Sequence, residues 1–550
     1  MKIMRIGIDL AKTVFQVHGV DAQEKPVCRR QLRRRQLLEF FTKPADLAGK
    51  DCLLLASTFG DGDPPDNAGA FWNALQADGT PRLTDTRFAV LAFGDSNYDQ
   101  FCGFGRKLDQ RLGELGAQRL STRADCEPEF QETAKTWLEA VSLALQGVPA
   151  AMPQPALVLA GDIETAVSEV VSLRKDAPKY SRTSPLHTRV LLNRLLNEEG
   201  SAKETRQYAF DLKGSSLTYE AGDALGVWPT NCPSLVGDIL STLKLTPATA
   251  VKVKDLGEMT LSEALLQHYE IARITPELLK LVRDKSGSSM LEGLLGEERK
   301  AELKQWLWGR QLIDLFQDCP LHCDAQELLS VLKRLQPRLY SISSSPKAFP
   351  DEVHLTVSTV RYGSKDKRRD GVCSSFLADR SAHGKVPIFV QKSAHFRPPK
   401  DTQTPMIMVG PGTGIAPFRA FLQERRAVGA TGKNWLFFGE QQEATDFYYR
   451  DELHAWVGDG HLHRLDTAFS RDQAKKAYVQ HRMLEQGAQL WAWLQEGAHF
   501  YVCGDASRMA KDVDAALKQV AHVHGGLSQE EAAAYFVQMA SDKRLVRDVY

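Results

Sequence analysis

Three glycines near residue 410 have the spacing of a loop that binds a pyrophosphate. An apolar run ends at Gly410, and Gly412 and Gly414 follow on either side of Thr413, before a helical pattern begins. Glycine lets the backbone approach a phosphate, and a helix start offers free N–H groups and the positive end of its dipole. A structural turn between a strand and a helix could use the same glycines. The strand before, the helix after and a second nucleotide-type strand downstream favour phosphate binding.

A second cluster combines cations with hydroxyl groups. Ser470 and Arg471 follow an apolar stretch, and Lys476 and Tyr478 come shortly afterwards. Such groups suit the 2′-phosphate that distinguishes NADPH from NADH. Ser470 is equally well explained as the N-cap of a solvated helix. The sequence leaves both interpretations open.

The segment Arg338–Ser341 places a guanidinium group, an aromatic ring and a hydroxyl group on one short strand. Because side chains alternate along a strand, Arg338 and Tyr340 share one face. This arrangement would suit a cation beside a diphosphate and a ring that stacks on a flavin. A lone tyrosine on a strand is, however, more often a packing residue.

The charge of the chain is balanced as a whole but not along its length. The 550 residues hold 69 Lys and Arg against 69 Asp and Glu, with 43% hydrophobic residues. This composition argues against a protein that is basic throughout and binds nucleic acid, and against an acidic disordered scaffold. Residues 1–50 nevertheless carry 11 Lys and Arg against 5 Asp and Glu. The first 50 residues therefore differ in kind from the rest.

Cysteine spacing and hydropathy indicate a protein of the reducing cytoplasm. None of the nine cysteines forms a CxxC pair, so we expect neither a disulfide framework nor a metal site. No apolar run reaches the roughly 18 residues needed to span a membrane. The first twelve residues lack the cleavage site of a signal peptide. Association with a membrane is therefore not expected.

Strands and helices alternate in two parts of the chain. Apolar runs at 52–57 and 87–94 are each followed by a turn and a helix, which predicts a parallel, doubly wound sheet; a further helix covers about 129–146. Residues 147–178 begin as an Ala/Pro-rich linker. Strands over 179–228 and 338–392 enclose a mostly helical stretch. From Thr404 the pattern is strand, helix, strand again. We expect an α/β multidomain protein.

Eight ordered segments resemble the NADPH-dependent diflavin reductases. They include RLYSISSSP (338–346), GVCSSFLADR (371–380), AFSRDQAKKAYVQ (468–480), YVCGDASRMAKDV (501–513) and KRLVRDVY (543–550). SSFLADR and the terminal RDVY are most similar to the flavoprotein alpha component of NADPH sulfite reductases. The resemblance covers about residues 51–550.

This resemblance implies an order of domains. A truncated flavodoxin-like, doubly wound FMN domain would cover 51–146, and a linker would follow over 147–178. A ferredoxin-reductase-type FAD β-barrel would cover 179–400, with a helical connecting insert at about 229–335. A Rossmann-like NADPH domain would cover 401–550.

The resemblance also implies site residues. Hydride transfer would be assisted by Ser341, Cys503 and Asp548, where a hydroxyl, a thiol and a carboxylate can position the nicotinamide. The residues implied for FAD are Arg338, Tyr340, Ser341, Thr356, Val357, Ser358, Tyr362, Gly371, Val372, Cys373, Ser374 and Tyr550, the last covering the flavin ring. Those implied for NADPH are Gly410, Gly412, Thr413, Gly414, Ser470, Arg471, Lys476, Tyr478, Gln480 and Asp512. Those implied for FMN are Ser57, Thr58, Phe59, Gly60, Asn97 and Tyr98, with Phe59 and Tyr98 stacking on the ring.

Residues 1–50 break the pattern. They contain no Thr-Gly-Asn-type loop for the FMN phosphate, and their only glycines are Gly7, Gly19 and Gly49. They resemble instead the start of a bacterial insertion-sequence transposase of the DEDD type, with Asp9 as its first metal-binding acid. The other carboxylates needed for two metal ions are missing, so DNA cleavage and nucleic-acid partners are not expected. We interpret the chain as a recombined gene product.

Loss of the first flavodoxin strands has a structural consequence. In a sheet of order 2-1-3-4-5, the strand Leu53–Ser57 would become an exposed edge, which favours aggregation. We expect Arg5–Leu10 to fill part of the vacant position without supplying a phosphate-binding loop. FMN would then bind poorly.

The leading functional hypothesis is an NADPH-dependent flavoprotein reductase. Electrons would pass from NADPH to FAD, then to FMN if it is bound, and then to a haem or iron–sulfur partner. The resemblance makes sulfite reductase, which forms sulfide for cysteine biosynthesis, the expected partner. The alternatives are an NADPH–FAD diaphorase without the FMN step, a transposase-derived DNA-binding fusion, and a non-functional fusion that folds only from about residue 179.

Overall fold

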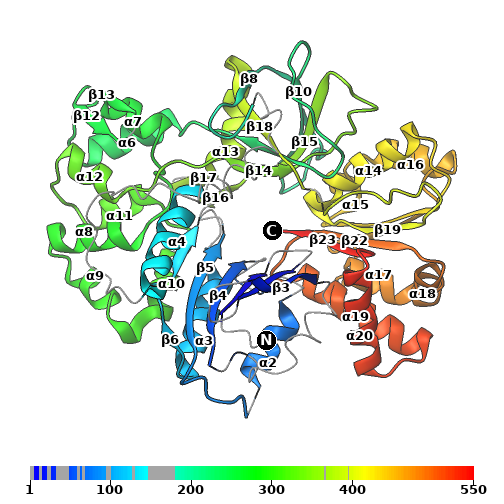
Figure 1. Ribbon diagram of the computed structural model, residues 1–550. Helices are drawn as coiled ribbons and strands as arrows, with labels where there is room; N and C mark the ends of the chain where they lie inside the picture. Colours follow the sequence, from blue (N-terminus) through cyan, green and yellow to red (C-terminus); the bar gives the residue numbers. More distant parts are fainter. Residues whose placement is uncertain are drawn as a thin grey trace. The chain divides into compact units, whose positions relative to one another are not determined.

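A computed structural model of the chain is shown in Figure 1. It describes residues 5–10, 15–20, 26–32, 47, 49–58, 62, 64, 68–77, 79–94, 101–126, 130–146, 180–254, 256–364, 367–393 and 395–550. Phe59, Gly60, Asn97, Tyr98 and the predicted linker 147–178 lie outside these residues. The chain forms two compact units, and each is described by itself. The first comprises 1–177, 404–409 and 479–550; the second comprises 178–403 and 410–478.

The first unit opens with a mixed sheet of order β3-β2-β1-β4-β5-β6, in which β7 also pairs with β5. β4, β5, β6 and β7 are parallel neighbours, as the alternation of strand and helix predicts. The strands are β1 (Arg5–Leu10), β2 (Phe15–Val20), β3 (Pro26–Leu32), β4 (Asp51–Ser57), β5 (Arg87–Phe93), β6 (Gln118–Arg119) and β7 (Ala124–Cys126). The helices are α2 (Gly69–Gln76), α3 (Gly103–Glu114) and α4 (Gln131–Leu145).

Both faces of this sheet pack against helices. On one side Leu54 and Val90 meet Phe104 and Leu108 of α3 in one core, and on the other Leu91 packs with Trp137 of α4. Burial on both faces is typical of parallel strands covered by helices. The described residues before 179 thus build cores of their own, which argues against a chain that folds only from residue 179.

The N-terminal strands occupy the side of β4 that would otherwise be an edge. β1 runs parallel to β4, with Arg5 opposite Asp51 and Leu10 opposite Ala56. The prediction that Arg5–Leu10 fills the vacant position is confirmed. β2 and β3 add two more antiparallel strands. β3 was not predicted, because its polar residues obscure any apolar alternation.

The first unit also contains parallel strands from the C-terminal part of the chain. β22 lies between β19 and β23, with parallel pairing on both sides. The strands are β19 (Met406–Val409), β22 (His499–Gly504) and β23 (Leu545–Val549). The helices are α17 (Val479–Glu485), α18 (Gly487–Gln495), α19 (Met509–Gly525) and α20 (Gln529–Ser541).

The second unit is built around two antiparallel sheets that share one core. One sheet has the order β15-β10-β9 and the other the order β14-β11-β18-β8, and a bridge between Ile342 and Leu355 joins them. Tyr208 and Leu355 of the first sheet pack with Val227 and Ile388 of the second. The strands are β8 (Leu186–Thr188), β9 (Val190–Leu195), β10 (Thr205–Asp211), β11 (Ala224–Val227), β14 (Arg338–Ser341), β15 (Glu352–Ser358) and β18 (Val386–Gln391).

A helical insert separates β11 from β14, as the leucine spacing predicts. Its helices bury Leu265, Leu279 and Phe316 in a separate core. Several ends carry caps: the Thr275 hydroxyl accepts from Leu278 N, and Asp324 and Glu327 form a capping box. The elements are α6 (Pro233–Thr242), β12 (Ala250–Val253), β13 (Gly257–Thr260), α7 (Leu261–Gln267), α8 (Pro276–Ser286), α9 (Ser289–Leu294), η2 (Glu297–Arg299), α10 (Lys300–Leu307), α11 (Leu312–Asp318) and α12 (Ala325–Val331).

The remaining elements of the second unit carry the predicted nucleotide-binding residues. A hairpin of β16 and β17 precedes a short helical run, and the parallel strands β20 and β21 flank two helices. These elements are β16 (Arg361–Ser364), β17 (Lys367–Asp370), α13 (Val372–Ser375), the π-helix η3 (Phe376–Arg380), η4 (Ser381–His383), η5 (Gly412–Gly414), α14 (Ile415–Ala427), β20 (Asn434–Glu440), α15 (Glu443–Asp446), α16 (Arg450–Gly458) and β21 (Arg464–Phe469).

The described residues contain neither a membrane-spanning helix nor a cluster of metal ligands. None of the described helices is long and apolar enough to cross a membrane. Within the same residues, no three His, Cys, Asp or Glu side chains form a group that could hold a metal ion.

Candidate flavin and nicotinamide nucleotide sites

β14 presents the predicted cation and ring of the FAD site. Arg338 and Tyr340 lie opposite Val227 and Leu225 of β11. The Arg338 guanidinium donates to Glu270 Oε2 at 2.9 Å and to the Gln336 carbonyl at 2.8 Å. These contacts hold the guanidinium in place while its side chain stays partly exposed. A fixed cation at this position suits a diphosphate.

The turn at Gly371 requires a glycine and begins a helix. A Cβ on Gly371 would lie 2.8 Å from Val360 Cβ and 2.9 Å from Ser374 Oγ. The Ser374 hydroxyl accepts from Val360 N at 3.0 Å, which ties the first turn of α13 to the preceding hairpin. The first N–H groups of a helix have no partner within it and can bind phosphate oxygens.

Tyr340 and Cys373 join the strand to this turn. Their hydroxyl and thiol are hydrogen-bonded, and burial raises the pKa of Tyr340 well above its usual value. Burial also raises the pKa of Cys373 to about 11. Both groups therefore stay protonated at neutral pH, and Cys373 serves packing rather than nucleophilic chemistry.

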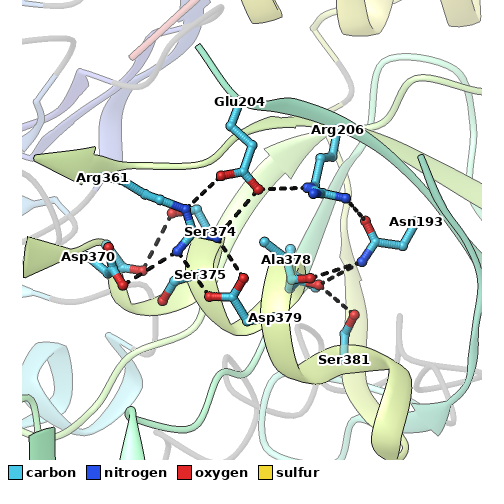
Figure 2. Close-up of polar contacts among 12 residues, drawn as sticks. Asn193, Glu204, Arg206, Arg361, Asp370, Ser374, Ser375, Ala378, Asp379 and Ser381 are labelled. Atoms are coloured by element: carbon cyan, nitrogen blue, oxygen red, sulfur yellow. Dashed lines mark hydrogen bonds and ion pairs between the residues drawn. The ribbon is translucent and has the colours of Figure 1, made fainter. Parts of the chain in front are cut away.

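An ion-pair network braces the same turn (Figure 2). Arg361 donates to Glu204 at 2.6 Å and to Asp379 of η3 at 2.6 Å, and it lies 3.5 Å from Asp370. Glu204 also accepts from Arg206 at 2.8 Å. The network thus ties β10, the β16–β17 hairpin and the π-helix after α13 together.

Arg361 and its neighbours change the pKa of the two carboxyl groups that they contact. Hydrogen bonds from Arg361 lower the pKa of Asp379. Burial alone would raise the pKa of Glu204, but hydrogen bonds from Arg361 and Arg206 lower it. Both carboxylates are therefore held charged, which strengthens the bracing.

Other predicted FAD residues use their side chains inside the protein. The Thr356 and Tyr449 hydroxyls are hydrogen-bonded at 2.6 Å, and Val357 is part of the core. Tyr362 is about one-third exposed, and its hydroxyl accepts from Gln311 Nε2 at 3.1 Å. Ser358 is partly exposed at the end of β15. Thr356 and Val357 thus offer a flavin no exposed side chain.

The glycine loop of the predicted NADPH site is closely packed. A Cβ on Gly410 would lie 2.5 Å from both the Gly414 carbonyl and the Phe418 ring. Gly412 has a φ of +59°, which favours glycine, and Thr413 lies between it and Gly414 in η5. The loop leads directly into α14, as the sequence predicts.

Ser470 and Arg471 lie beside the end of β20. Their N–H groups donate to the Glu440 and Gln441 carbonyls at 2.9 and 2.7 Å. The side chains of Arg471, Lys476 and Tyr478 are exposed. No helix starts at Ser470, because the next described helix begins at Val479. The alternative that Ser470 caps a helix is therefore wrong.

Predicted residues of the first unit form two pairs. Gln480 Nε2 donates to Asp512 Oδ2 at 3.0 Å. Cys503 lies opposite Asp548 in the β22–β23 pairing, and its buried thiol is 4.0 Å from Asp548 Oδ2. Tyr550 is about half exposed, and its backbone is hydrogen-bonded to Gly504 and Ala506. Ser341 belongs to the other unit, at the end of β14.

The described FMN candidates lie where β4 ends. Ser57 is the last residue of β4, and Thr58 N donates to the Phe93 carbonyl at 2.9 Å. The Thr58 hydroxyl accepts from Phe104 N at 3.2 Å, at the start of α3. The side chain of Thr58 thus anchors the loop, and the positions of Phe59, Gly60, Asn97 and Tyr98 lie outside the described residues.

Comparisons with known proteins identify three domain families in order along the chain. Family models for flavodoxin, the FAD binding domain and the oxidoreductase NAD-binding domain match residues 38–137, 178–376 and 408–515. The sulfite reductase [NADPH] flavoprotein alpha-component of Bacillus subtilis (strain 168) is 46% identical over 501 residues, which cover 90% of this chain and 81% of the relative. Proteins of the same name from Mannheimia succiniciproducens and Yersinia enterocolitica are 43% and 42% identical over similar shares.

The chain belongs to the family of sulfite reductase [NADPH] flavoprotein alpha-components. It is an NADPH-dependent flavoprotein oxidoreductase whose domains are those for FMN, FAD and NADP, in that order. The predicted family, fold class and cofactors are confirmed. The comparisons give no support to the resemblance of residues 1–50 to a transposase.

The described residues of this flavoprotein fit FAD and NADPH. The fixed Arg338 cation and the helix start at Val372 offer charge and N–H groups for a diphosphate. The glycine loop offers N–H groups, and the exposed Arg471 offers positive charge, for a dinucleotide with a 2′-phosphate. For FMN, the parallel pairing of β4 with β5 fixes the residues from which the two flavin loops start. β1, however, pairs with the next strand, β2, in antiparallel orientation.

The motifs missed the residues that brace these sites. Arg361 precedes the predicted residue Tyr362, but its partners Glu204 and Asp379 are 157 and 18 positions away. Lys203 pairs with the buried Glu440, 237 positions later. Spacing within a segment carries no signal for such pairs. Only the burial of a charged residue in an apolar strand, as at Glu440 in NWLFFGE, hints at a partner.

Proposed function

We propose that this chain oxidises NADPH at FAD and delivers the electrons to a sulfite reductase haemoprotein. One observation carries the proposal: Cys503 lies beside Asp548 on two parallel strands, in a chain that belongs to a family of NADPH flavoproteins. When bound, FAD would supply the redox chemistry, because it can take up two electrons as a hydride and pass them on one at a time. The partner follows from the name of the relatives, which are flavoprotein components of sulfite reductase.

The residues of the chain position the nicotinamide. The Cys503 thiol and the Asp548 carboxylate lie side by side, where a polarisable group and a negative charge can stabilise the positive charge that develops on the ring. From the resemblance we assign Ser341 as the third member. Tyr550 would cover the flavin ring and move aside for the nicotinamide.

Two electron acceptors test this proposal. We expect the purified chain to reduce ferricyanide with NADPH at a rate set by FAD, and to reduce cytochrome c much more slowly. In this family the first acceptor usually needs only FAD, whereas the second depends on FMN. Addition of FMN should raise only the cytochrome c rate. Absence of ferricyanide reduction in a preparation that contains FAD would contradict the proposed function.

Replacement of Arg471 tests the assignment of the 2′-phosphate site. Arg471→Ala should raise the KM for NADPH about 10- to 100-fold, because one or two charge-assisted hydrogen bonds are lost. The KM for NADH, which lacks this phosphate, should change little. Lys400→Ala, another exposed cation of the same unit, is the control and should change neither value. Equal losses with both nucleotides would exclude the assignment.

A further inference from the structure

Arg419 is a buried cation in α14, the helix that starts directly after the glycine loop. Only 5% of the residue is exposed. The neighbouring Phe418 packs against the loop, where a Cβ on Gly410 would lie 2.5 Å from its ring. Arginine is almost never fully buried unless it is paired. The partners of Arg419 therefore indicate what the side chain does.

The guanidinium of Arg419 joins several elements of the second unit. Its Nη1 donates to the Ser343 carbonyl at 2.8 Å, in the loop that follows β14. The same nitrogen lies 3.4 Å from Nδ1 of His354 on β15. Its Nε donates to Glu452 of α16 at 2.6 Å. The cation thus ties α14 to the loop after Ser341, to β15 and to a neighbouring helix.

His354 accepts from the cation as a neutral ring. Its Nδ1 also lies 3.4 Å from Nε2 of Gln207, and both arginine and this amide nitrogen can only donate. Nδ1 must therefore accept, which places the ring proton on Nε2, 2.8 Å from Glu352 Oε2. Burial lowers the pKa of His354, so the ring stays neutral at neutral pH. A neutral imidazole can lie beside Arg419 without charge repulsion.

Aromatic rings also lie beside the guanidinium of Arg419. Its central carbon is 4.7 Å from the centre of the Tyr449 ring and 6.0 Å from that of Phe349. Such contacts contribute more where the cation is shielded from water. Tyr449 in turn shares a 2.6 Å hydrogen bond with the Thr356 hydroxyl on β15. The rings and the hydrogen bonds together hold the guanidinium in one orientation.

A second residue of α14 holds the same loop. Gln423, one helical turn after Arg419, accepts from Ser345 N at 3.1 Å. Ser343 and Ser345 are fully buried, and Ser343 lies two residues after Ser341, where β14 ends. The end of β14 is therefore fixed against the helix whose start carries the predicted pyrophosphate loop.

We propose that Arg419 is a positioning residue for hydride transfer. It fixes Ser341, which we assign to the nicotinamide and the flavin, relative to the helix that starts at the glycine loop. The proposal rests on the proposed function, because it requires that NADPH reduces FAD in this chain. A misplacement of about 1 Å can lower the rate of such a reaction about 100-fold. Binding of either nucleotide should depend much less on Arg419, whose guanidinium is used inside the protein.

Stopped-flow reduction of the FAD-loaded full chain by NADPH tests the proposal. In Arg419→Met we expect the limiting rate of flavin reduction to fall about 10- to 100-fold. FAD should remain bound. The apparent dissociation constant of NADPH should stay within about threefold of the parent value, because a loss in rate alone marks an effect on the transition state.

Two further variants separate positioning from stability. Arg419→Met leaves the Glu452 carboxylate without this cation, and Arg419→Met/Glu452→Gln removes that charge. The double variant should regain most of the Tm of the parent chain but not its rate, because the Ser343 carbonyl still lacks its donor. Arg426 is an exposed arginine of the same helix that pairs with Asp459 at 2.7 Å, and Arg426→Met should reduce FAD at the parent rate.

Three outcomes would overturn the role of Arg419. They are an unchanged limiting rate in Arg419→Met, recovery of the rate together with the Tm in the double variant, and a loss of FAD or NADPH binding that accounts for the slower reduction. An FAD-loaded parent chain that NADPH does not reduce would instead contradict the proposed function, and the inference with it.

Discussion

Replacing Arg361 with alanine is expected to release FAD from the protein. The guanidinium contacts Glu204, Asp370 and Asp379, and its own side chain is 19% exposed. Removal of one partner of a buried ion pair costs about 3–5 kcal/mol, and the partial exposure of these carboxylates reduces this to about 1–3 kcal/mol. We expect a lower Tm and an FAD dissociation constant raised at least tenfold, measured by thermal unfolding and by flavin fluorescence.

Arg368→Ala is the matched control for this experiment. Arg368 lies on the same hairpin, is more than half exposed and pairs at 3.0 Å with Asp370 of the same strand. The Arg368→Ala variant should bind FAD with the affinity of the parent chain. Retention of FAD by Arg361→Ala with the affinity of the parent chain would show that the network does not brace the turn at Gly371.

The same network predicts the effect of acid on FAD retention. Because Arg361 lowers the pKa of Asp379 and contributes to the lowered pKa of Glu204, their stabilisation is complete above the unfolded values of about 4 and is lost as the pH falls below them. The parent chain should lose FAD as the pH falls from about 5 to 3. Arg361→Ala, which already lacks these ion pairs, should show a smaller change over the same interval.

Replacing Lys203 with methionine is expected to impair NADPH binding. The carboxylate of Glu440 is 2% exposed and is contacted by Lys203, by the Tyr448 hydroxyl at 3.1 Å and by Gln441 N at 2.7 Å. It also lies 3.4 Å from the position of a Cβ on Gly412. Loss of the lysine leaves an uncompensated negative charge beside the loop that receives a pyrophosphate. We expect the KM for NADPH to rise at least tenfold and the free energy of unfolding to fall by about 2–4 kcal/mol.

A second substitution distinguishes charge from packing. In Lys203→Met/Glu440→Gln the buried carboxylate is replaced by a neutral amide. The KM for NADPH should therefore return most of the way to the value of the parent chain. Lys213→Met, an exposed lysine of the same unit, should behave like the parent chain. If the double variant binds NADPH as poorly as Lys203→Met does, the uncompensated charge is not the cause.

Contiguous motifs predicted the local structure of the candidate nucleotide-binding segments. The glycines after residue 409, the strand Arg338–Ser341 and the turn at Gly371 all lie within short segments whose local structure the sequence determines. The position of β1 beside β4 followed from the need to cover an apolar edge.

Long-range pairs were not predictable in the same way. Glu204 and Arg361, or Lys203 and Glu440, meet only because antiparallel and parallel strands from distant segments are brought together. The N-cap interpretation of Ser470 failed because no helix starts there: the next described helix begins at Val479, and Ser470 N instead donates to the Glu440 carbonyl. The local secondary-structure propensity of the residues around Ser470 gives no information about a contact with a distant strand.

Anaerobic titration of the purified chain with NADPH tests the assigned function most directly. The flavin absorbance near 450 nm should bleach, with about one NADPH consumed for each bound FAD, and NADH should be far less effective. Retention of the oxidised FAD spectrum in excess NADPH would contradict the assignment of this chain as an NADPH-dependent flavoprotein reductase.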